Sequence, residues 1–346
     1  MLKRHDISLF TISMLLLAAS LVSCEKEKGG PTHETTPIEF GNVETRAVVE
    51  SAEIMKTTGG FGVFGYVSDV VDPLFKNDKV YWDVGKRVWT YGEPEYWIPD
   101  HIFHFFAYYP YSTAETADYG VSGVQALGDN SGFKLNFITP GTADFDLLST
   151  YKSVDTGSND FDASAPVPMN FGHEMVNVNL KIWRDQGKHQ NDKMKVKDVS
   201  LSNVAWGGTL TKTAESATWQ YSAPKNDISR VVAGYEIGAA TREGSGLTTG
   251  GTPAMPFGDA GLLLIPQPAG TITLRIVYEL WLSGAGEDGW NEYILETTLP
   301  PATWTAGSRI TYNVLLSNIV DITFYYISTS VTPWGTPQVG GTIIIK

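Results

Sequence analysis

Several side chains of the sequence are of types that could perform catalysis or bind a ligand. Asp144 and Asp146 would lie ~6.6 Å apart on one face of a strand, and two carboxylates could serve a glycosidase. His101 and His104 have no third metal ligand at a useful spacing. Gly60–Gly65 matches the dinucleotide pattern GxGxxG, but neither a helix nor a βαβ context surrounds it. We therefore expect Asp144 and Asp146 to lie at a solvated strand end and the two histidines to have no special role. We expect the protein to bind neither a cofactor nor a metal and not to be an enzyme.

Cys24 is the only cysteine of the 346 residues. It follows a basic start and the apolar run Ile7–Val22, which is shorter than the ~20 residues of a transmembrane helix and is typical of a secretory signal. Leu21-Val22-Ser23-Cys24 resembles the lipobox of bacterial lipoproteins, which implies cleavage before Cys24 and a lipid on its thiol. We expect residues 1–23 to be a signal peptide and the chain to be exported as an outer-membrane lipoprotein precursor. The alternative is a chance cysteine after an apolar run.

Composition limits the remaining classes of protein. The length suggests roughly two domains, and 42% hydrophobic residues are enough for sizeable cores. The formal charge of −13 argues against a nucleic-acid partner. Residues 25–37 have the composition of a flexible tether.

The body of the chain has the pattern of β-strands. Apolar and polar residues alternate along Val176–Ile182 and Ile272–Leu280, as in strands with one buried face. Gly284–Gly289 predicts the turn of a hairpin whose second strand is Asn291–Leu299, whereas Gly238–Gly258 predicts a long loop. Further predicted strands are Gly60–Val67, Phe103–Tyr109, Lys134–Thr139, Lys195–Val204, Gly261–Ile265, Arg309–Leu316 and Ile319–Val331. Short strands separated by Gly and Pro predict an all-β fold of sandwiches.

The segment Tyr81–Tyr109 is dense in aromatic residues, among them Trp82, Trp89 and Trp97. Exposed rings could form a platform for a glycan. Buried rings would instead form a core, because aromatic side chains bury large areas. We favour the core.

Five segments in order resemble fimbrillin-like proteins, the lipoprotein-derived type V pilins. They read "GGFGVFGY", "YGEPEYWIPDHIFHFFAYYP", "VPMNFGHEMVNVNLKIW", "LLLIPQ" and "LPPATWTAGSRITYNVLLSNIVDITFYYISTSVTPW". The resemblance implies a pilin subunit of a cell-surface fimbrium with two transthyretin-like β-sandwich domains, 47–167 and 168–346. It also implies other pilin subunits, of the same or another kind, as partners and a role in adhesion to a host or bacterial surface receptor.

The resemblance further implies processing after an N-terminal strand. In family members an Arg-specific protease cuts behind an arginine that follows this strand, and the matching bond here joins Arg46 to Ala47. Residues 24–46 would then be a tether and a removable strand, with Ile38 and Phe40 on one face. The alternative is an ordinary surface arginine in a linker.

The sequence also contains a candidate for a strand that could replace the removed one. Residues 339–346 include the β-branched run Thr342, Ile343, Ile344 and Ile345 behind Gly340 and Gly341. A loose run of this kind would aggregate, but it could complete the groove of another subunit by strand addition. The membrane would be a partner, through the lipid, only before processing. The alternative function is a surface glycan-binding lipoprotein that does not polymerise.

Overall fold

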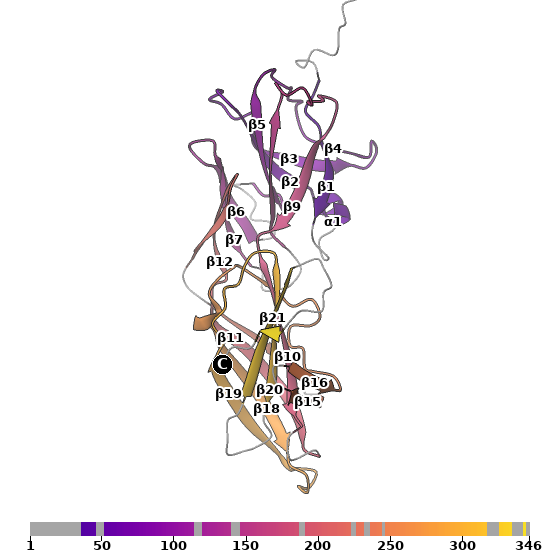
Figure 1. Cartoon of the computed structure of the whole chain (residues 1–346), viewed down its shortest axis with the longest axis vertical. Helices are drawn as coiled ribbons and strands as arrows, with labels where there is room; N and C mark the ends of the chain where they lie inside the picture. Colours follow the sequence, from indigo (N-terminus) through magenta and orange to yellow (C-terminus); the bar gives the residue numbers. More distant parts are fainter. Residues whose placement is uncertain are drawn as a thin grey trace, which may run out of the picture. The chain divides into compact units, whose positions relative to one another are not determined.

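The structure is a computed structural model that describes residues 36–45, 52–113, 120–139, 146–186, 191–222, 226–231, 236–243, 246–316, 325–333 and 342–343. Strands dominate the described residues, which confirms the predicted all-β class. The helical elements in these ranges are short, such as the helix α1 (Ala52–Thr57) and the 3-10 turn η3 (Ala269–Thr271). The strands of these ranges form four sheets, which can be followed in Figure 1.

The first sheet, called sheet 1, has seven strands. In spatial order they are β1 (Phe40–Thr45), β9 (Val167–His173), β8 (Leu148–Asp155), β5 (Ile102–Tyr109), β2 (Phe61–Val67), β3 (Phe75–Asp83) and β4 (Val88–Thr90). The strands β2 and β5 lie near its centre. All seven residues of β2 are buried, which explains why its sequence is apolar without alternation.

A second seven-stranded sheet, sheet 2, is formed by later residues. It runs β16 (Gly246–Gly250), β15 (Ala239–Glu243), β10 (Val176–Asp185), β20 (Ser308–Leu316), β21 (Tyr325–Pro333) and β22 (Thr342–Ile343), and β17 (Leu262–Leu264) also pairs with β10. The strands β10 and β20 pair in parallel over eight residue pairs. Figure 1 shows β10, β20 and β21 side by side.

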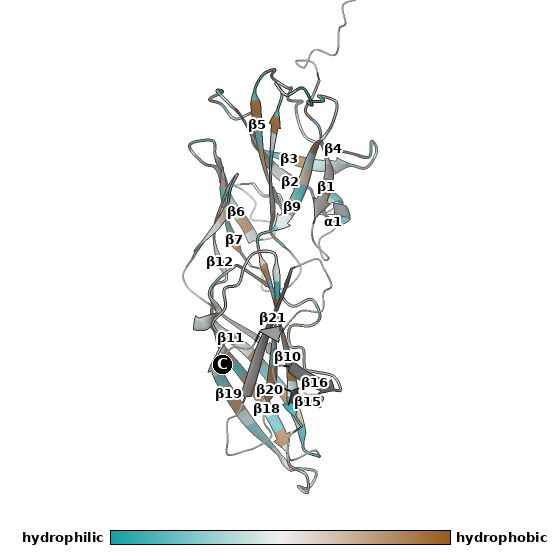
Figure 2. Ribbon diagram, viewed as in Figure 1, coloured by the Kyte–Doolittle hydropathy of each residue, from teal (hydrophilic) through white to brown (hydrophobic). Residues whose placement is uncertain are grey.

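Two four-stranded sheets complete the described part of the chain. Sheet 3 runs β14 (Asn226–Val231), β11 (Lys193–Val204), β18 (Thr273–Trp281) and β19 (Trp290–Thr298). Sheet 4 runs β13 (Ala217–Tyr221), β12 (Gly207–Thr213), β7 (Gly132–Ile138) and β6 (Val121–Ala126). Hydrophilic and hydrophobic residues largely alternate along β18 in Figure 2, as expected for a strand with one buried face.

Three main hydrophobic cores hold the sheets together. One core fills one face of sheet 1 and includes Phe61, Phe75 and Phe105. A second packs the other face of sheet 1 against sheet 4, for example Phe64 against Phe133 with stacked rings 5.6 Å apart. The third lies between sheets 2 and 3. Because sheet 1 is covered on both faces, β2 and β5 contribute to two cores at once.

Most of the predicted strands are found in the structure. Predicted strands overlap β2, β5, β7, β10, β11, β17, β18, β19 and β20, and β21 overlaps the described part of Ile319–Val331. The turn predicted at Gly284–Gly289 joins β18 to β19, which pair from Trp281 and Trp290 onward. The long loop predicted over Gly238–Gly258 is wrong, because β15 and β16 form an antiparallel hairpin there.

The division into domains 47–167 and 168–346 stays a prediction. Hydrogen-bond ladders cross the expected boundary near Val167 in two places. The strand β9 begins at Val167 and joins sheet 1, and β12 pairs with β7 along seven residues. A division into domains that follows the hydrogen-bonded sheets would therefore place β9 with sheet 1 and β12 with sheet 4.

Candidate functional site

Hydrogen bonds hold the strand β1 on one side and the residues just before it on the other. On one side it pairs in parallel with β9, with Phe40 opposite Val167, and Val167 donates its N–H to Glu39 O at 2.7 Å. On the other side Ile38 donates its N–H to Glu95 O at 2.7 Å, and Tyr91 Oη donates to Ile38 O at 2.6 Å. The start of the strand therefore lies between β9 on one side and the segment that contains Tyr91 and Glu95 on the other.

The position of β1 brings the two edges of sheet 1 together. β1 and β4 are the terminal strands of the sheet, yet they also lie beside each other. Pro37 forms an isolated bridge with Tyr96, shortly after β4. Because β1 occupies the space between β9 and the segment after β4, it covers backbone groups that would otherwise form two open edges.

The side chains of β1 and its approach alternate between core and solvent. Ile38 is fully buried and Phe40 is 3% exposed, whereas Glu39 between them is exposed. The Phe40 ring makes edge contacts with four aromatic rings at centroid distances of 5.4–6.3 Å: Phe75, Phe105, Tyr91 and Phe61. Val43 is 9% exposed and joins the same core. The strand thus inserts apolar side chains into the centre of sheet 1's core.

A close approach of the β1 backbone to a proline ring restricts the register of β1. Gly41 lies opposite Pro168 in the ladder, and a β-carbon added to Gly41 would be 2.6 Å from Pro166 Cβ. Real β-carbons essentially never come that close, and a proline ring has little freedom to move away. Glycine at this position is therefore a steric requirement.

A hollow of about 350 Å³ opens beside β1. It is lined by β1 residues, by Pro166 and by side chains of α1, β3 and β4, including Lys56, Trp82 and Trp89. The ammonium of Lys56 lies 4.2 Å from the Trp82 ring centroid, an attractive cation–π contact. The hollow exposes apolar surface directly along the strand.

The other predicted site residues are only partly within the described ranges. Thr342 and Ile343 form β22, which pairs antiparallel with Ser330 and Thr329 of β21 at the end of sheet 2. Ile344 and Ile345 lie outside the described residues, as do Cys24, Arg46 and Ala47. In the ranges that are described, no helix combines the length and the apolar character needed to cross a membrane.

The aromatic segment Tyr81–Tyr109 is mainly core, as the sequence favours. Trp97 is 2% exposed, and six further rings of the segment are buried: Trp89, Phe103, Phe105, Phe106, Tyr108 and Tyr109. Tyr81 and Tyr96 are more than 40% exposed but lie in different elements. The segment therefore supplies packing for both faces of β5.

The two histidines of this segment are held by ordinary hydrogen bonds. His101 Nδ1 lies 2.6 Å from Pro99 O, and His104 Nδ1 lies 2.8 Å from Tyr151 Oη. Burial lowers the pKa of His104, because desolvation disfavours the charged imidazolium. No group of three potential metal-ligating side chains occurs in the described part of the chain.

The environment of Asp146 differs from the one that the sequence predicts. A solvated strand end is predicted, but Asp146 is fully buried and its carboxylate is hydrogen-bonded to His173 Nδ1. Burial raises the pKa of Asp146, while the bond to His173 acts in the opposite direction. The carboxylate can be buried because the buried His173, at the end of β9, is its hydrogen-bond partner, which the local sequence does not indicate. Asp144 lies outside the described residues.

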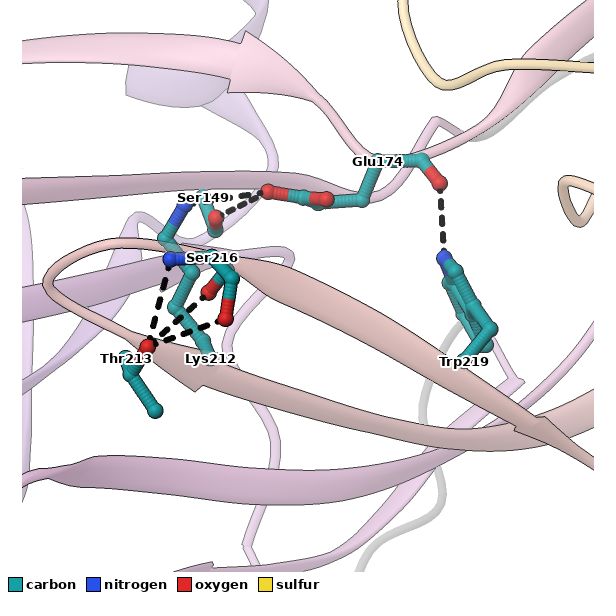
Figure 3. A network of polar contacts seen from close by, with 6 residues as sticks. All are labelled: Ser149, Glu174, Lys212, Thr213, Ser216 and Trp219. Carbon is teal, nitrogen blue, oxygen red and sulfur yellow. Dashed lines mark hydrogen bonds and ion pairs between the residues drawn. The ribbon is translucent and has the colours of Figure 1, made fainter.

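A second buried carboxylate lies next to this pair and has no signal in the local sequence. Glu174 accepts hydrogen bonds from Ser149 Oγ and, at 3.5 Å, from Lys212 Nζ. Its backbone oxygen accepts a bond of 3.1 Å from Trp219 Nε1, and Figure 3 shows how these groups surround it. The Glu174 side chain is 6% and that of Lys212 17% exposed. This network links β8 and the end of β9 in sheet 1 to β12 and β13 in sheet 4.

The described fold is all-β, and its N-terminal strand completes the core of the first sheet. The model of the fimbrillin-like family matches residues 45–334. Because this match spans most of the chain, the chain belongs to the fimbrillin-like family. Membership supports a pilin-like function at the cell surface.

Solved structures resemble the chain as well. A fimbrial protein from Bacteroides vulgatus aligns with a TM-score of 0.64 at 18% identity, over 86% of this chain and 99% of that one, which shows a common fold. Candidate cell adhesion proteins from Bacteroides uniformis and Bacteroides ovatus align with TM-scores of 0.46 and 0.48, each at 17% identity. They cover 86% and 87% of this chain and 98% and 99% of their own. None of the curated proteins matches the chain.

Proposed function

We propose that the chain is a structural pilin subunit of a cell-surface fimbrium and is assembled by protease-triggered strand exchange. The observation that supports this most strongly is the position of β1. Its side chains fill the core of sheet 1, and Arg46, the proposed cleavage site, directly follows its last residue, Thr45. A cut between Arg46 and Ala47 would leave β1 attached to its groove by non-covalent contacts alone.

The groove is suited to accept a strand from another subunit. Loss of β1 would free the edge of β9 and uncover the aromatic rings that surround Phe40. Unpaired edge groups beside an apolar groove are the usual target of strand addition. The hollow beside β1 provides a place where an incoming side chain could begin to bind.

Cleavage would also remove a kinetic barrier to exchange. While the chain is intact, β1 is tethered beside its groove, and its effective concentration exceeds that of any strand from another subunit. After the cut, the freed strand can dissociate and a donor can replace it. The proposed donor is residues 339–346, whose described part, β22, pairs with β21 by only two residue pairs. Breaking such a short pairing requires little free energy.

The proposal predicts that Arg46→Ala blocks assembly. Wild-type precursor treated with an Arg-specific protease should begin at Ala47 and form ladders that resist mild heating, because strand exit is slow. The Arg46→Ala variant should stay a monomer. Size-exclusion chromatography, denaturing gels without boiling and N-terminal sequencing of the assembled form provide the measurements.

A variant that lacks residues 342–346 serves as the control for donor function. It should be cleaved after Arg46 and stay folded, but it should not join other subunits. Ladders formed by this truncated protein would show that the donor lies elsewhere. An assembled form that begins at Cys24, or far from Ala47, would contradict strand release and favour a non-polymerising surface glycan-binding lipoprotein.

The proposal includes a lipid on Cys24 that holds the precursor at the outer membrane until cleavage. Each buried CH₂ of an acyl chain contributes about 0.8 kcal/mol to membrane binding. We expect Cys24→Ser to abolish incorporation of a labelled fatty acid in expressing cells. The Arg46→Ala variant should keep the label, and wild-type protein should lose it after cleavage. A labelled Cys24→Ser protein would disprove the attachment site.

A further inference from the structure

A pair of tryptophans lies at the turn end of the β18–β19 hairpin. Trp281 and Trp290 are directly opposite each other in the last pair of the ladder before the turn. Both indoles are half-buried, and neither belongs to the hydrophobic cores of the described residues. They lie on the face of sheet 3 opposite the core, because core residues such as Leu280 alternate with them.

Lysines of the neighbouring strand β11 lie over both rings. Lys193 is opposite Trp281 in the β11–β18 ladder, and its Nζ is 5.8 Å from the centroid of that ring. Lys195 Nζ is 4.0 Å from the centroid of the Trp290 ring. Cation–π contacts of this kind stabilise exposed rings by about 0.5–1 kcal/mol. They hold the indoles in place without covering them by a core.

The turn between the two strands is also fixed. Trp281 Nε1 donates to Gly286 O at 2.9 Å, and Ser283 N–H donates to Asp192 Oδ1 at 2.7 Å. A β-carbon on Gly289 would be 2.3 Å from Ala285 Cβ, so the two ends of the turn pack tightly. The turn therefore forms a pre-organised wall beside the tryptophans.

A pocket of about 280 Å³ lies between these elements. Its lining is Lys193, Trp281, Ala285, Glu287 and Trp290. This volume is slightly below the range of pockets that hold drug-sized ligands, and it suits a single six-membered ring with its substituents. The lining offers two aromatic surfaces, one ammonium donor and one carboxylate acceptor.

These groups match the chemistry of an uncharged sugar. A pyranose ring has an apolar C–H face that stacks on an indole, and its hydroxyls both donate and accept hydrogen bonds. Glu287 can accept from a hydroxyl, and Lys193 can donate to one. A cationic ligand would meet the ammonium groups of Lys193 and Lys195, whereas an anionic ligand would meet Glu287 and a chain of net charge −13.

We propose that this pocket binds an uncharged hexopyranose unit of a surface glycan. Lys193, Trp281, Glu287 and Trp290 contact the sugar, and Lys195 is a positioning residue that orients Trp290. The site lies in sheet 3, whereas β1 and β22 belong to sheets 1 and 2, so it does not require polymerisation. A purely structural tryptophan pair would stabilise the hairpin but would bind no ligand.

The test uses the uncleaved wild-type chain and saturation-transfer NMR with lactose, cellobiose and mannobiose, each titrated to a saturating signal. We expect at least one of them to bind with a Kd below about 10 mM, and sialyllactose to bind no more tightly than lactose. Trp290→Ala should weaken binding by about tenfold or more, which corresponds to about 1.4 kcal/mol. Tyr221→Ala, an exposed aromatic residue of sheet 4, is the matched control and should bind normally.

A second variant keeps the test valid if Trp290→Ala misfolds. Glu287 is exposed in the turn, so Glu287→Gln should preserve the circular dichroism spectrum and the Tm while it weakens sugar binding several-fold. The proposal is overturned if none of the three disaccharides binds saturably, or if both variants bind as the wild type does. Because the uncleaved monomer is used, failure of strand exchange does not affect the result.

Discussion

Replacement of Phe40 by alanine is expected to lower the free energy of unfolding by about 3–5 kcal/mol. Phe40 is 3% exposed and contacts four aromatic rings, three of them on strands or segments far along the chain. Its truncation removes buried apolar surface and leaves a cavity that these rigid rings cannot fill. Urea denaturation of the uncleaved chain, followed by tryptophan fluorescence, measures the change.

Glu39→Ala is the matched control for this prediction. Glu39 directly precedes Phe40 and β1, but its side chain is exposed, so the change should stay within about 0.5 kcal/mol. A loss below about 1 kcal/mol for Phe40→Ala would mean that the strand contributes little to the core. The groove would then provide little binding energy for any replacing strand.

Replacement of Lys212 by methionine is expected to cost about 3–5 kcal/mol, the usual effect of breaking a buried ion pair. The variant leaves the Glu174 carboxylate, 6% exposed, without the ammonium 3.5 Å away. Adding Glu174→Gln to the same variant removes the unpaired charge and should recover a substantial part of the loss. Lys86→Met, in an exposed pair 3.9 Å from Asp83, should change stability by less than about 1 kcal/mol.

The cost of Lys212→Met should also depend on pH. Burial raises the pKa of Glu174 above its ordinary value of 4.5, and Lys212 and Ser149 act against this rise. Without the ammonium the pKa rises further, so the folded variant binds a proton that the unfolded chain has already lost. Stability of the variant relative to wild type therefore falls as pH rises from the ordinary value through the raised one. The deficit measured at neutral pH should shrink near pH 5, and a deficit that is constant over this range would contradict the role of Glu174.

The sequence predicts best those strands whose two faces differ. Leu274, Ile276 and Leu280 alternate with less buried residues in β18, and the glycine-rich turn that follows fixes the hairpin to β19. The same pattern is sufficient to predict Ile38 and Phe40 as inward side chains, and both are buried. The alternation of apolar and polar residues predicts these strands correctly, because the residues of each strand themselves indicate which face is buried.

The sequence fails where structure depends on distant partners. The hairpin of β15 and β16 has no clear strand pattern, because its five-residue strands, Ala239–Glu243 and Gly246–Gly250, contain few large apolar residues. Only two residue pairs, between β15 and Arg184 and Asp185 of β10, join it to the sheet. The burial of Asp146 depends on His173, and that of Glu174 on Lys212. Such pairings between remote segments leave no periodic signal, so no local pattern could have revealed the network.

The contact between Gly41 and Pro166 has a consequence for the specificity of assembly. A strand that takes the place of β1 beside β9 would meet the same proline ring, so a residue with a β-carbon opposite Pro168 would collide with it. A donor is then accepted only in an alignment that brings a glycine to this position. Gly340 and Gly341 lie within the proposed donor segment, directly before its β-branched residues, and allow two such alignments. Partner choice among related subunits would accordingly depend on the spacing between a glycine and the β-branched residues that follow it, and apolar character alone would not suffice.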